Sequence, residues 1–280
     1  MSFFKYRGGG LNLSGRTAVM GILNVTPDSF SDGGRYMRAE DAVARAMAIE
    51  REGADILDIG GQSTRPGHTP VSPQEETARL LPVLEALRGS LSIPISVDTY
   101  YPEVARAALE AGAAILNDVS GGLDNGMLAL TAQSGAGLVS MYPGRAGEEQ
   151  GGDDILRLTR SFFERALSAA EQAGLPRENL CVDPGIGFGR TREEDIRLLA
   201  NLPELMAGLP DVALLVGASR KRVVGAFCGN PPFEQRLPGT LALHTAAQCG
   251  GARILRAHDV AQAVQAARVT DALIAARCKG

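Results

Sequence analysis

The chain has 280 residues, of which 45% are hydrophobic and 21% charged, so it is expected to bury a substantial core rather than to stay disordered. Its formal net charge of -4 argues against nucleic acid or an anionic membrane as the main partner. No apolar run approaches the roughly 18 residues that span a bilayer, and the start of the chain lacks a signal-peptide pattern, so a cytoplasmic protein is predicted. The four cysteines are scattered without a CxxC pair, which indicates free thiols and neither a zinc site nor a disulfide framework.

Short apolar runs alternate with longer helical stretches. The eight apolar runs are residues 17–23, 54–60, 93–97, 113–117, 137–142, 179–183, 212–218 and 252–255. The clearest helical stretches are 38–53, 73–88, 102–112, 153–174 and 259–276, and Gly53, Gly112 and Gly174 stand where helices should stop. The pattern predicts an α/β fold, a single (β/α)8 TIM barrel over residues 1–280, with a doubly wound open sheet as the alternative. Residues 28–37 and 144–154 read as long loops.

Polar groups follow seven of the eight apolar runs, at the strand ends where such barrels place their active sites. Asp98, Asn117 and Asp183 each follow apolar residues, so burial of the two carboxylates would be costly without a partner. A heterocycle with several N–H donors would supply one, because a carboxylate accepts two adjacent N–H groups. The alternative is that these residues are helix caps.

Cationic residues form a second group. The chain uses 25 arginines but three lysines, and Lys221 is the one lysine far from a terminus. Arg65, Arg256 and His258 add to it, and the loops after the last two strands are the usual phosphate-binding corner of such barrels. An anionic, phosphorylated group is therefore predicted as part of the ligand, with surface ion pairs and a helix cap as the alternative interpretation.

Glycine-rich segments follow several strands, and Phe188 lies within one of them, PGIGFG. An aromatic side chain in such a rim loop is suited to pack against a flat ring, although a core position is the alternative.

Seven sequence motifs occur along the chain in this order: NVTPDSFSDGG, GADILDIGGQSTRPG, ISVDT, LNDVSGG, VDPGIGFG, GASRKR and RAHDV. In sequence and spacing they resemble the dihydropteroate synthase family over residues 17–272. The resemblance implies a transferase of folate biosynthesis, a sulfonamide target that joins 4-aminobenzoate to 6-hydroxymethyl-7,8-dihydropterin diphosphate with release of pyrophosphate. It also implies a dissociative, Mg2+-assisted displacement and a homodimer.

The resemblance also implies roles for individual residues. Asn24 would be the magnesium ligand, and Asp32, Arg65 and Lys221 would be catalytic. The substrate-binding residues would be Thr64, Asp98, Asn117, Met141, Asp183, Phe188, Ser219, Lys221, Arg256 and His258. Among these, Asp98, Asn117, Asp183 and Lys221 would bind the pterin, Thr64, Arg256 and His258 the diphosphate, and Arg65, Phe188 and the helix start after Ser219 would enclose 4-aminobenzoate.

Four places depart from the family pattern: Gln62 where Glu is common, Ser140 where His is common, Arg190 where Lys is frequent, and residues 142–152. They leave two alternatives open, a pterin-binding paralogue without synthase activity and a methyltetrahydrofolate methyltransferase. A methyltransferase would need no diphosphate site, so Thr64, Arg256 and His258 count against it.

Overall fold

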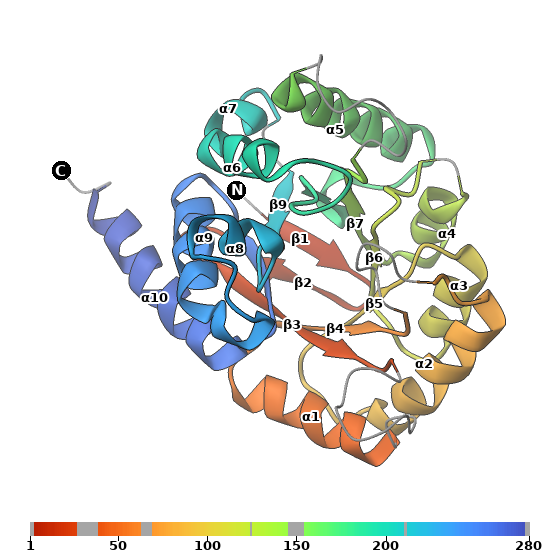
Figure 1. The fold of residues 1–280 in the computed structure, drawn as a ribbon. Helices are drawn as coiled ribbons and strands as arrows, with labels where there is room; N and C mark the ends of the chain where they lie inside the picture. The colour runs from red at the N-terminus through yellow and green to blue at the C-terminus, as the bar shows by residue number, and fades with distance from the viewer. Residues whose placement is uncertain are drawn as a thin grey trace.

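A computed structural model describes residues 3–26, 39–62, 69–123, 125–144, 154–209 and 212–277. Eight parallel strands close into a barrel in the order β10-β3-β4-β5-β6-β7-β8-β9, and helices surround it (Figure 1). Because β10 pairs with both β9 and β3, the sheet has no free edge. This closure confirms the predicted (β/α)8 barrel and excludes the open doubly wound sheet; that residues 1–280 form one domain stays a prediction.

The barrel strands correspond to the eight apolar runs. They are β3 (Ala18–Asn24), β4 (Ile56–Gly60), β5 (Ile95–Asp98), β6 (Ile115–Asp118), β7 (Gly137–Met141), β8 (Leu180–Asp183), β9 (Ala213–Val216) and β10 (Ile254–Ala257). The helices are α1 (Ala39–Arg51), α2 (Pro73–Leu87), α3 (Pro102–Glu110), α4 (Met127–Ser134), α5 (Ile155–Gln172), α6 (Arg192–Ala200), α7 (Leu202–Met206), α8 (Arg222–Phe227), α9 (Leu237–Cys249) and α10 (Val260–Arg277). Short 3-10 turns, η2 (Arg177–Asn179) and η3 (Phe233–Gln235), complete the set.

Local sequence signals set the helix limits. Ser72 caps α2 by accepting a hydrogen bond from the backbone N–H of Glu75 at 3.2 Å, and Thr191 and Glu194 form a reciprocal capping box on α6. Gly53, Gly112 and Gly174 have φ values of 98°, 114° and 76°, a left-handed backbone that glycine adopts without strain. The predicted helix stops are therefore confirmed.

Residues of each strand alternate between two buried layers. In β4, Leu57 and Ile59 face the helices, whereas Ile56 lies in the barrel interior. Both layers are apolar in the half of the barrel formed by the amino-terminal parts of the strands, which explains why the strands appear as continuous apolar runs in the sequence. Near the strand ends, the interior positions change from apolar to polar, and this change creates the candidate site.

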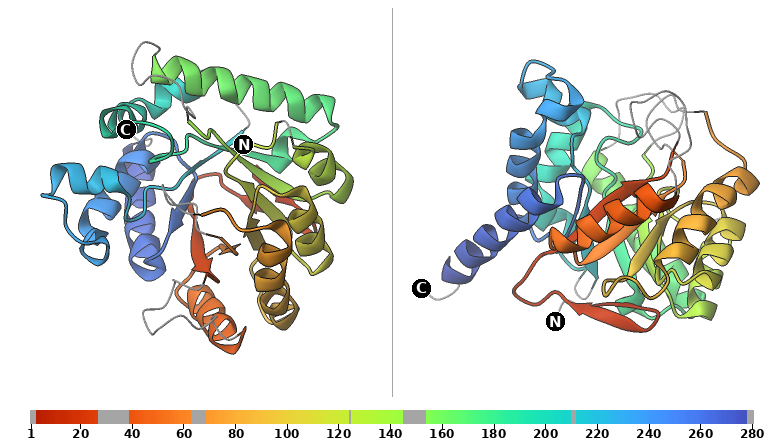
Figure 2. Two further views of the ribbon diagram at one scale, coloured as in Figure 1. Left: turned by 45° about the vertical axis from the view of Figure 1, so that its right-hand side comes forward. Right: turned by 90° about the horizontal axis from the view of Figure 1, so that it is seen from below.

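An N-terminal hairpin that the sequence did not predict closes the other end of the barrel. Strands β1 (Phe3–Tyr6) and β2 (Gly9–Asn12) pair antiparallel, and they lie across that end in the right-hand view of Figure 2. Phe4 is fully buried with the interior cluster, and a methyl group added at Gly137 would come within 2.9 Å of its ring. The hairpin thus covers the apolar lower interior.

The two ends of the barrel sequence are joined by hydrogen bonds. Asp271 of α10 accepts from the Thr17 backbone N–H at 2.8 Å and from the Thr17 hydroxyl at 2.9 Å. Gln248 of α9 donates to the same carboxylate at 2.6 Å and to the Ala267 carbonyl at 2.9 Å. These contacts fix α9 and α10 against the start of β3. No helix in the described part of the chain has the length and apolarity required to cross a membrane.

Candidate functional site

Polar side chains occupy the interior-facing positions at the carboxyl ends of the strands, an edge we call the mouth. Strand alternation places these residues on the interior face: Asn24, Asp58, Asp98, Asn117, Met141, Asp183 and Arg256. All except Asn24 and Arg256 are buried, with at most 6% of their surface exposed. Because all eight barrel strands are parallel, all of these ends meet at one opening. The sequence-predicted residues on the strands are therefore brought together.

Arg256 joins two of the carboxylates. Its Nε donates to Asp58 Oδ2 at 2.6 Å and its Nη2 donates to Asp98 Oδ2 at 2.8 Å. Asn117 Nδ2 also donates to Asp58 Oδ2, at 3.0 Å. Burial raises the pKa of Asp98, while the Arg256 guanidinium acts in the opposite direction. Arg256 thus lies among the predicted pterin-binding residues, as part of a buried ion-pair network and not a surface pair.

Asp183 and Lys221 form the other side of the mouth. Burial raises the pKa of Asp183 to about 6, although its Oδ1 accepts a 2.7 Å hydrogen bond from the Gly185 backbone N–H. Burial, followed by the nearby Arg256 cation, lowers the pKa of Lys221 to about 8. Three carboxyl groups, Asp58, Asp98 and Asp183, therefore share a poorly solvated opening with two cations, Arg256 and Lys221. Such an arrangement is typical of a site that binds a polar ligand.

Phe188 lies over Lys221. The Lys221 Nζ is 4.0 Å from the Phe188 ring centroid, and the lysine stem passes close to Gly187. Met141 lies beside the start of the same segment, because a methyl group at Gly185 would come within 3.2 Å of its Cγ. The segment after β8 thus places an aromatic face and an ammonium together at the rim, and Phe188 is not a core residue.

Arg190 holds this segment against the end of β7. Its side chain is 1% exposed; Nε donates to the Phe188 carbonyl at 2.9 Å and Nη2 to the Tyr142 carbonyl at 3.4 Å. The guanidinium also lies 5.1 Å from the Tyr142 ring centroid. In addition, Asp195 of α6 accepts from the Gly187 backbone N–H at 2.7 Å. The arginine that departs from the family pattern is therefore a buried anchor of the loop that carries Phe188.

Ser219 and His258 contact each other across the last two strand ends. The Ser219 hydroxyl accepts from the His258 backbone N–H at 3.1 Å and lies 2.9 Å from His258 Nδ1. Burial and the Arg256 cation lower the pKa of His258 to about 3, so its ring is neutral near pH 7. Of the predicted diphosphate contacts, His258 therefore offers a neutral imidazole, while Arg256 supplies positive charge.

Arg220 has an uncommon backbone conformation for a non-glycine residue, with φ of 55°. Its N–H donates to Thr240 Oγ1 at 2.9 Å, and its guanidinium binds the Asp259 carboxylate through two nitrogens, at 2.9 and 2.5 Å. These partners hold the strained turn from which Lys221 projects.

The helix-cap alternative fails for Asp98 and Asn117. The N-cap of α3 is Tyr101 and that of α4 is Gly126, and neither helix has a side-chain cap. Three predicted residues, Asp32, Thr64 and Arg65, lie outside the described residues. The sequence-based site prediction does not include Asp58, which lies within an apolar run, although a carboxylate inside such a run is itself a signal of a site.

Two other departures from the family pattern have structural partners. Ser140 faces the helices, and its hydroxyl donates to the Gly121 carbonyl at 2.7 Å. Gln62 donates to Glu76 of α2 and accepts from the Tyr100 hydroxyl. Neither side chain points into the mouth, so neither removes a predicted contact.

Asn24 offers an oxygen ligand for magnesium at the mouth. Asn24 ends β3 beside Gly60, where a methyl group would come to 3.4 Å from Asn24 Oδ1. Because Gly60 has no side chain, the carboxamide oxygen of Asn24 has room at the mouth. Such an oxygen ligand, together with phosphate and water oxygens, suits Mg2+. No group of three or more His, Cys, Asp or Glu side chains within the described ranges could hold a metal ion without such help.

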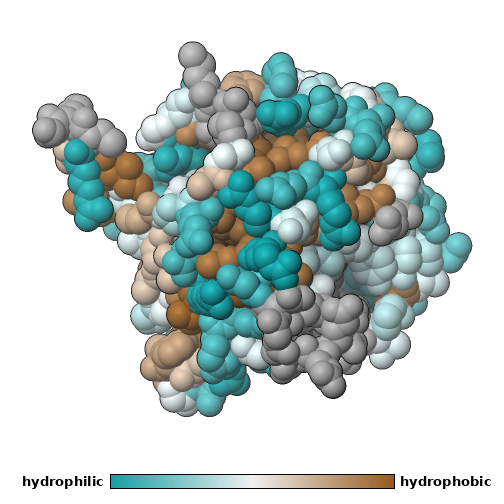
Figure 3. Space-filling view, turned by 90° about the horizontal axis from the view of Figure 1, so that it is seen from above, coloured by the Kyte–Doolittle hydropathy of each residue, from teal (hydrophilic) through white to brown (hydrophobic). Residues whose placement is uncertain are grey.

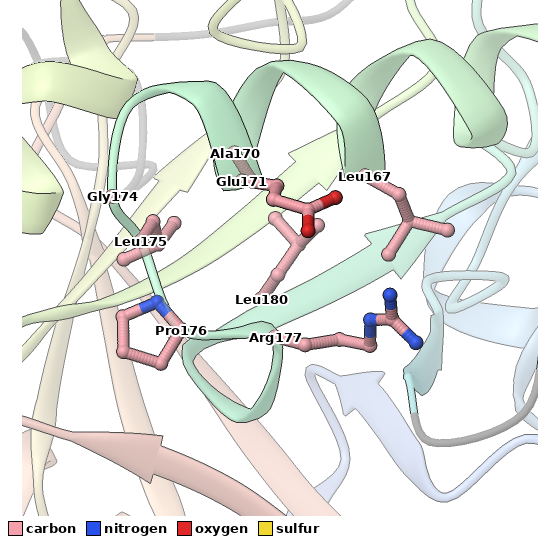
Figure 4. A pocket seen from close by; sticks show the side chains of 8 residues that line it. All are labelled: Leu167, Ala170, Glu171, Gly174, Leu175, Pro176, Arg177 and Leu180. Carbon is pink, nitrogen blue, oxygen red and sulfur yellow. The ribbon is translucent and has the colours of Figure 1, made fainter.

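A separate pocket of about 330 Å³ lies at the opposite end of β8 (Figure 4). It is lined by Leu167, Ala170, Glu171, Gly174, Leu175, Pro176, Arg177 and Leu180. Leu180 begins β8, whereas Asp183 ends it, so this pocket is remote from the mouth.

Comparisons with known proteins agree with this geometry. A family model described as pterin binding enzyme matches residues 20–258. The chain is 45% identical over 264 residues to dihydropteroate synthase of Synechocystis sp., covering 92% of this chain and 90% of the relative. It is 44% identical to the solved Xanthomonas albilineans dihydropteroate synthase with 4-aminobenzoic acid, with a TM-score of 0.88 and coverage of 95% of this chain and 96% of that one. The Burkholderia cenocepacia dihydropteroate synthase complexed with 7,8-dihydropteroate is 38% identical, also with a TM-score of 0.88, covering 100% and 99% of the two chains.

Proposed function

Because the chain belongs to the dihydropteroate synthase family of pterin-binding enzymes, we propose that it joins 4-aminobenzoate to 6-hydroxymethyl-7,8-dihydropterin diphosphate. The products are 7,8-dihydropteroate and pyrophosphate, which makes it a transferase of folate synthesis. The observation that carries the proposal is the buried polar cluster at the mouth, where Asp98, Asn117 and Asp183 face one opening together with Arg256 and Lys221.

The pterin end of the substrate supplies the donors that this cluster needs. Asp98 Oδ1 is buried and has no hydrogen-bond partner in the part of the chain that the structure describes. A ring N–H or the exocyclic amine of a pterin would satisfy it, and Asp183 presents a second carboxylate across the mouth. Asn117 offers both a donor and an acceptor. These residues orient the ring so that its methylene group faces the second substrate.

The chemistry places little demand on general-base catalysis. The C–O bond to the diphosphate breaks with the electron pair leaving on the diphosphate, and the 4-aminobenzoate nitrogen then bonds to the methylene carbon and releases its proton to water. An arylamine is already unprotonated near pH 7. Arg256 and Lys221 supply positive charge near the departing group, and Phe188 with Lys221 offers a flat face beside a cation for the arylamine.

Magnesium belongs to this proposal, with Asn24 as its protein ligand and with Asp32 and substrate phosphate oxygens as further candidate ligands. When bound, Mg2+ would neutralise charge that develops on the departing diphosphate. The roles of Arg65 at the second substrate and of Thr64 and His258 at the diphosphate rest on the family resemblance. A cytoplasmic location is likewise part of the proposal.

We also propose a homodimer formed through α10. Val269 and Leu273 of this helix are 59% and 61% exposed. The end of α10 projects from the body of the molecule, and Figure 3 shows hydrophobic side chains on that arm. A second copy would cover this apolar face. Light scattering should give the mass of a dimer, and replacing Val269 and Leu273 by Arg should give a monomer; a monomeric native chain refutes the assembly.

The experiment that tests the activity measures pyrophosphate release from the pterin diphosphate with Mg2+, with and without 4-aminobenzoate, and detects dihydropteroate. Product formed only with the arylamine supports the proposal, and omission of Mg2+ should slow it. Tight pterin binding without coupled product would favour the non-catalytic paralogue instead.

A further inference from the structure

Glu76 of α2 is a buried carboxyl group that the reaction described above does not use. Its residue is 0% exposed and lies behind the barrel wall, on the helix side of β4 and β5. Oε2 accepts from Gln62 Nε2 at 3.2 Å and from Thr99 Oγ1 at 3.1 Å, and Oε1 has no partner among the described residues. A group of this kind is costly to bury, so its connections merit a specific explanation.

The two donors stand immediately beyond two strand ends at the mouth. Gln62 follows Gly60, the last residue of β4, by two positions, and Thr99 directly follows Asp98, the last residue of β5. The network continues, because the Tyr100 hydroxyl donates to Gln62 Oε1 at 3.2 Å and Arg79 of α2 donates to the Gly61 carbonyl at 2.9 Å. One helix therefore holds the segments that leave two adjacent strands.

The two segments depend on Glu76 to different degrees. Asp98 has a second anchor, the 2.8 Å hydrogen bond from Arg256, and sits in the strand ladder. The Gln62 side chain contacts Glu76 and Tyr100, and Thr64 and Arg65 come two and three residues later in the sequence. A disturbance at Glu76 should therefore affect the chain after β4 more than the carboxylate that ends β5.

We propose that Glu76 is a positioning residue which, through Gln62 and Thr99, fixes the exits of β4 and β5 for the coupling of 4-aminobenzoate. This inference rests on the proposed function, since the substrate named is that of the synthase. The charged and titratable groups that surround Glu76 are Arg79 on the same helix, Asp98 on β5 and the hydroxyl of Tyr100. Burial raises the pKa of Glu76 to about 7, so the carboxyl is readily held in its neutral form.

The pairing of one carboxyl with one amide suggests a matched set of variants. Gln62→Glu places two carboxyl groups about 3.2 Å apart, so that they must share a proton and repel each other once it is lost. The swap Gln62→Glu with Glu76→Gln restores one amide and one carboxyl and keeps an acceptor for Thr99 and for Tyr100. Glu76→Leu removes both hydrogen bonds. Gln248→Leu is the control, because it also removes two hydrogen bonds of a buried side chain but lies on α9, near the start of β3.

Steady-state kinetics should separate positioning from stability. We expect Glu76→Leu to lower kcat/KM for 4-aminobenzoate by about tenfold or more, while the Kd of the pterin diphosphate changes less than about threefold, since small misplacements at a site carry large rate effects. Gln62→Glu should lose activity as the pH rises and the shared proton is lost, and the swap should restore kcat/KM to within about threefold. Gln248→Leu should lower the Tm without changing kcat/KM.

Backbone hydrogen exchange tests the positioning without relying on turnover. Exchange at residues 60–62 and 99–101 should quicken in Glu76→Leu and in Gln62→Glu at pH 8 but match the native chain in the swap. Unchanged exchange and kinetics in Glu76→Leu, or losses that simply follow the Tm as in Gln248→Leu, would overturn the proposal. A native chain that makes no dihydropteroate would refute the function, while the exchange result would still decide the role of Glu76.

Discussion

The ammonium of Lys221 lies 4.0 Å from the centroid of the Phe188 ring, although the two residues come from different strand exits of the barrel. Phe188 follows β8, and Lys221 follows β9 through the strained turn at Arg220. Their contact gives the rim an aromatic face and a positive charge in one place, which suits an aromatic carboxylate such as 4-aminobenzoate.

Phe188→Ala should raise the KM for 4-aminobenzoate by about tenfold, because an aromatic or cation–π contact contributes roughly 1–2 kcal/mol. Steady-state kinetics with the arylamine as the varied substrate measure this. Phe188→Leu keeps apolar bulk without the ring face and should give an intermediate KM. A KM unchanged in both variants would show that the ring does not face this substrate.

Asp98→Asn should weaken binding of the pterin diphosphate by roughly a hundredfold or more. The change removes the charge that pairs with Arg256 and turns one acceptor towards the ligand into a donor. Calorimetric titration measures the affinity. Ser96→Ala, on the same face of β5, is the control, because the buried Ser96 hydroxyl has no partner among the described residues and its loss should leave affinity unchanged. Native affinity in Asp98→Asn would remove Asp98 from the pterin site.

Arg190→Lys should raise the KM for 4-aminobenzoate by several-fold while leaving pterin affinity close to native. A single ammonium lacks the planar fork that donates to both the Phe188 and Tyr142 carbonyls and stacks on the Tyr142 ring. Kinetics and titration on the same preparation separate the two effects. If both substrates were affected equally, Arg190 would support the whole mouth and not the Phe188 loop alone.

His244 should make the fold sensitive to acid. Both of its ring nitrogens are buried without a partner in the part of the chain that the structure describes, and burial lowers its pKa to about 4. Between about pH 4 and 6.5 the unfolded chain therefore binds the proton more readily, so the free energy of unfolding falls as pH falls through this window, by about 3 kcal/mol in all. Below pH 4 this contribution stays constant.

Denaturant titrations of the native chain and of His244→Leu at pH 4.5, 6 and 8 measure this effect. The difference in unfolding free energy between the two proteins should shift in favour of the variant as the pH is lowered. His258 also has a lowered pKa, but it is present in both proteins and cancels in the comparison. A difference that does not change with pH would show that His244 gains a partner on protonation.

The barrel and most of the mouth were predictable because they depend on local signals. Asp98, Asn117 and Asp183 each end an apolar run, and parallel strands bring such ends to one edge whatever the details of packing. The five helices named from the sequence also lie within three residues of those observed at each end. These features need no knowledge of which strand contacts which.

Features that depend on partners distant in sequence were not predictable. Asp58 lies within an apolar run of the sequence. Its place in the site becomes clear only in the structure, where Arg256, 198 residues away, donates a hydrogen bond to it. The roles of Gln62 and Arg190 depend likewise on Glu76 and Tyr142. The N-terminal hairpin was not predicted because its strands, FFKY and GGLN, lack the apolar run that marks the barrel strands, and Phe4 is buried only against the closed barrel.

The hydrogen bonds between Thr17 and Asp271 span 254 residues. During synthesis on the ribosome, β3 therefore emerges long before its neighbour β10 and its partner on α10. At 5–20 residues per second, synthesis of the intervening residues takes roughly 13–50 s. Until then β3 has one open edge and the ring is incomplete. Nascent chains that stop short of α10 should therefore be substrates for chaperones or proteases, and the last helix would be the step that commits the chain to its native state.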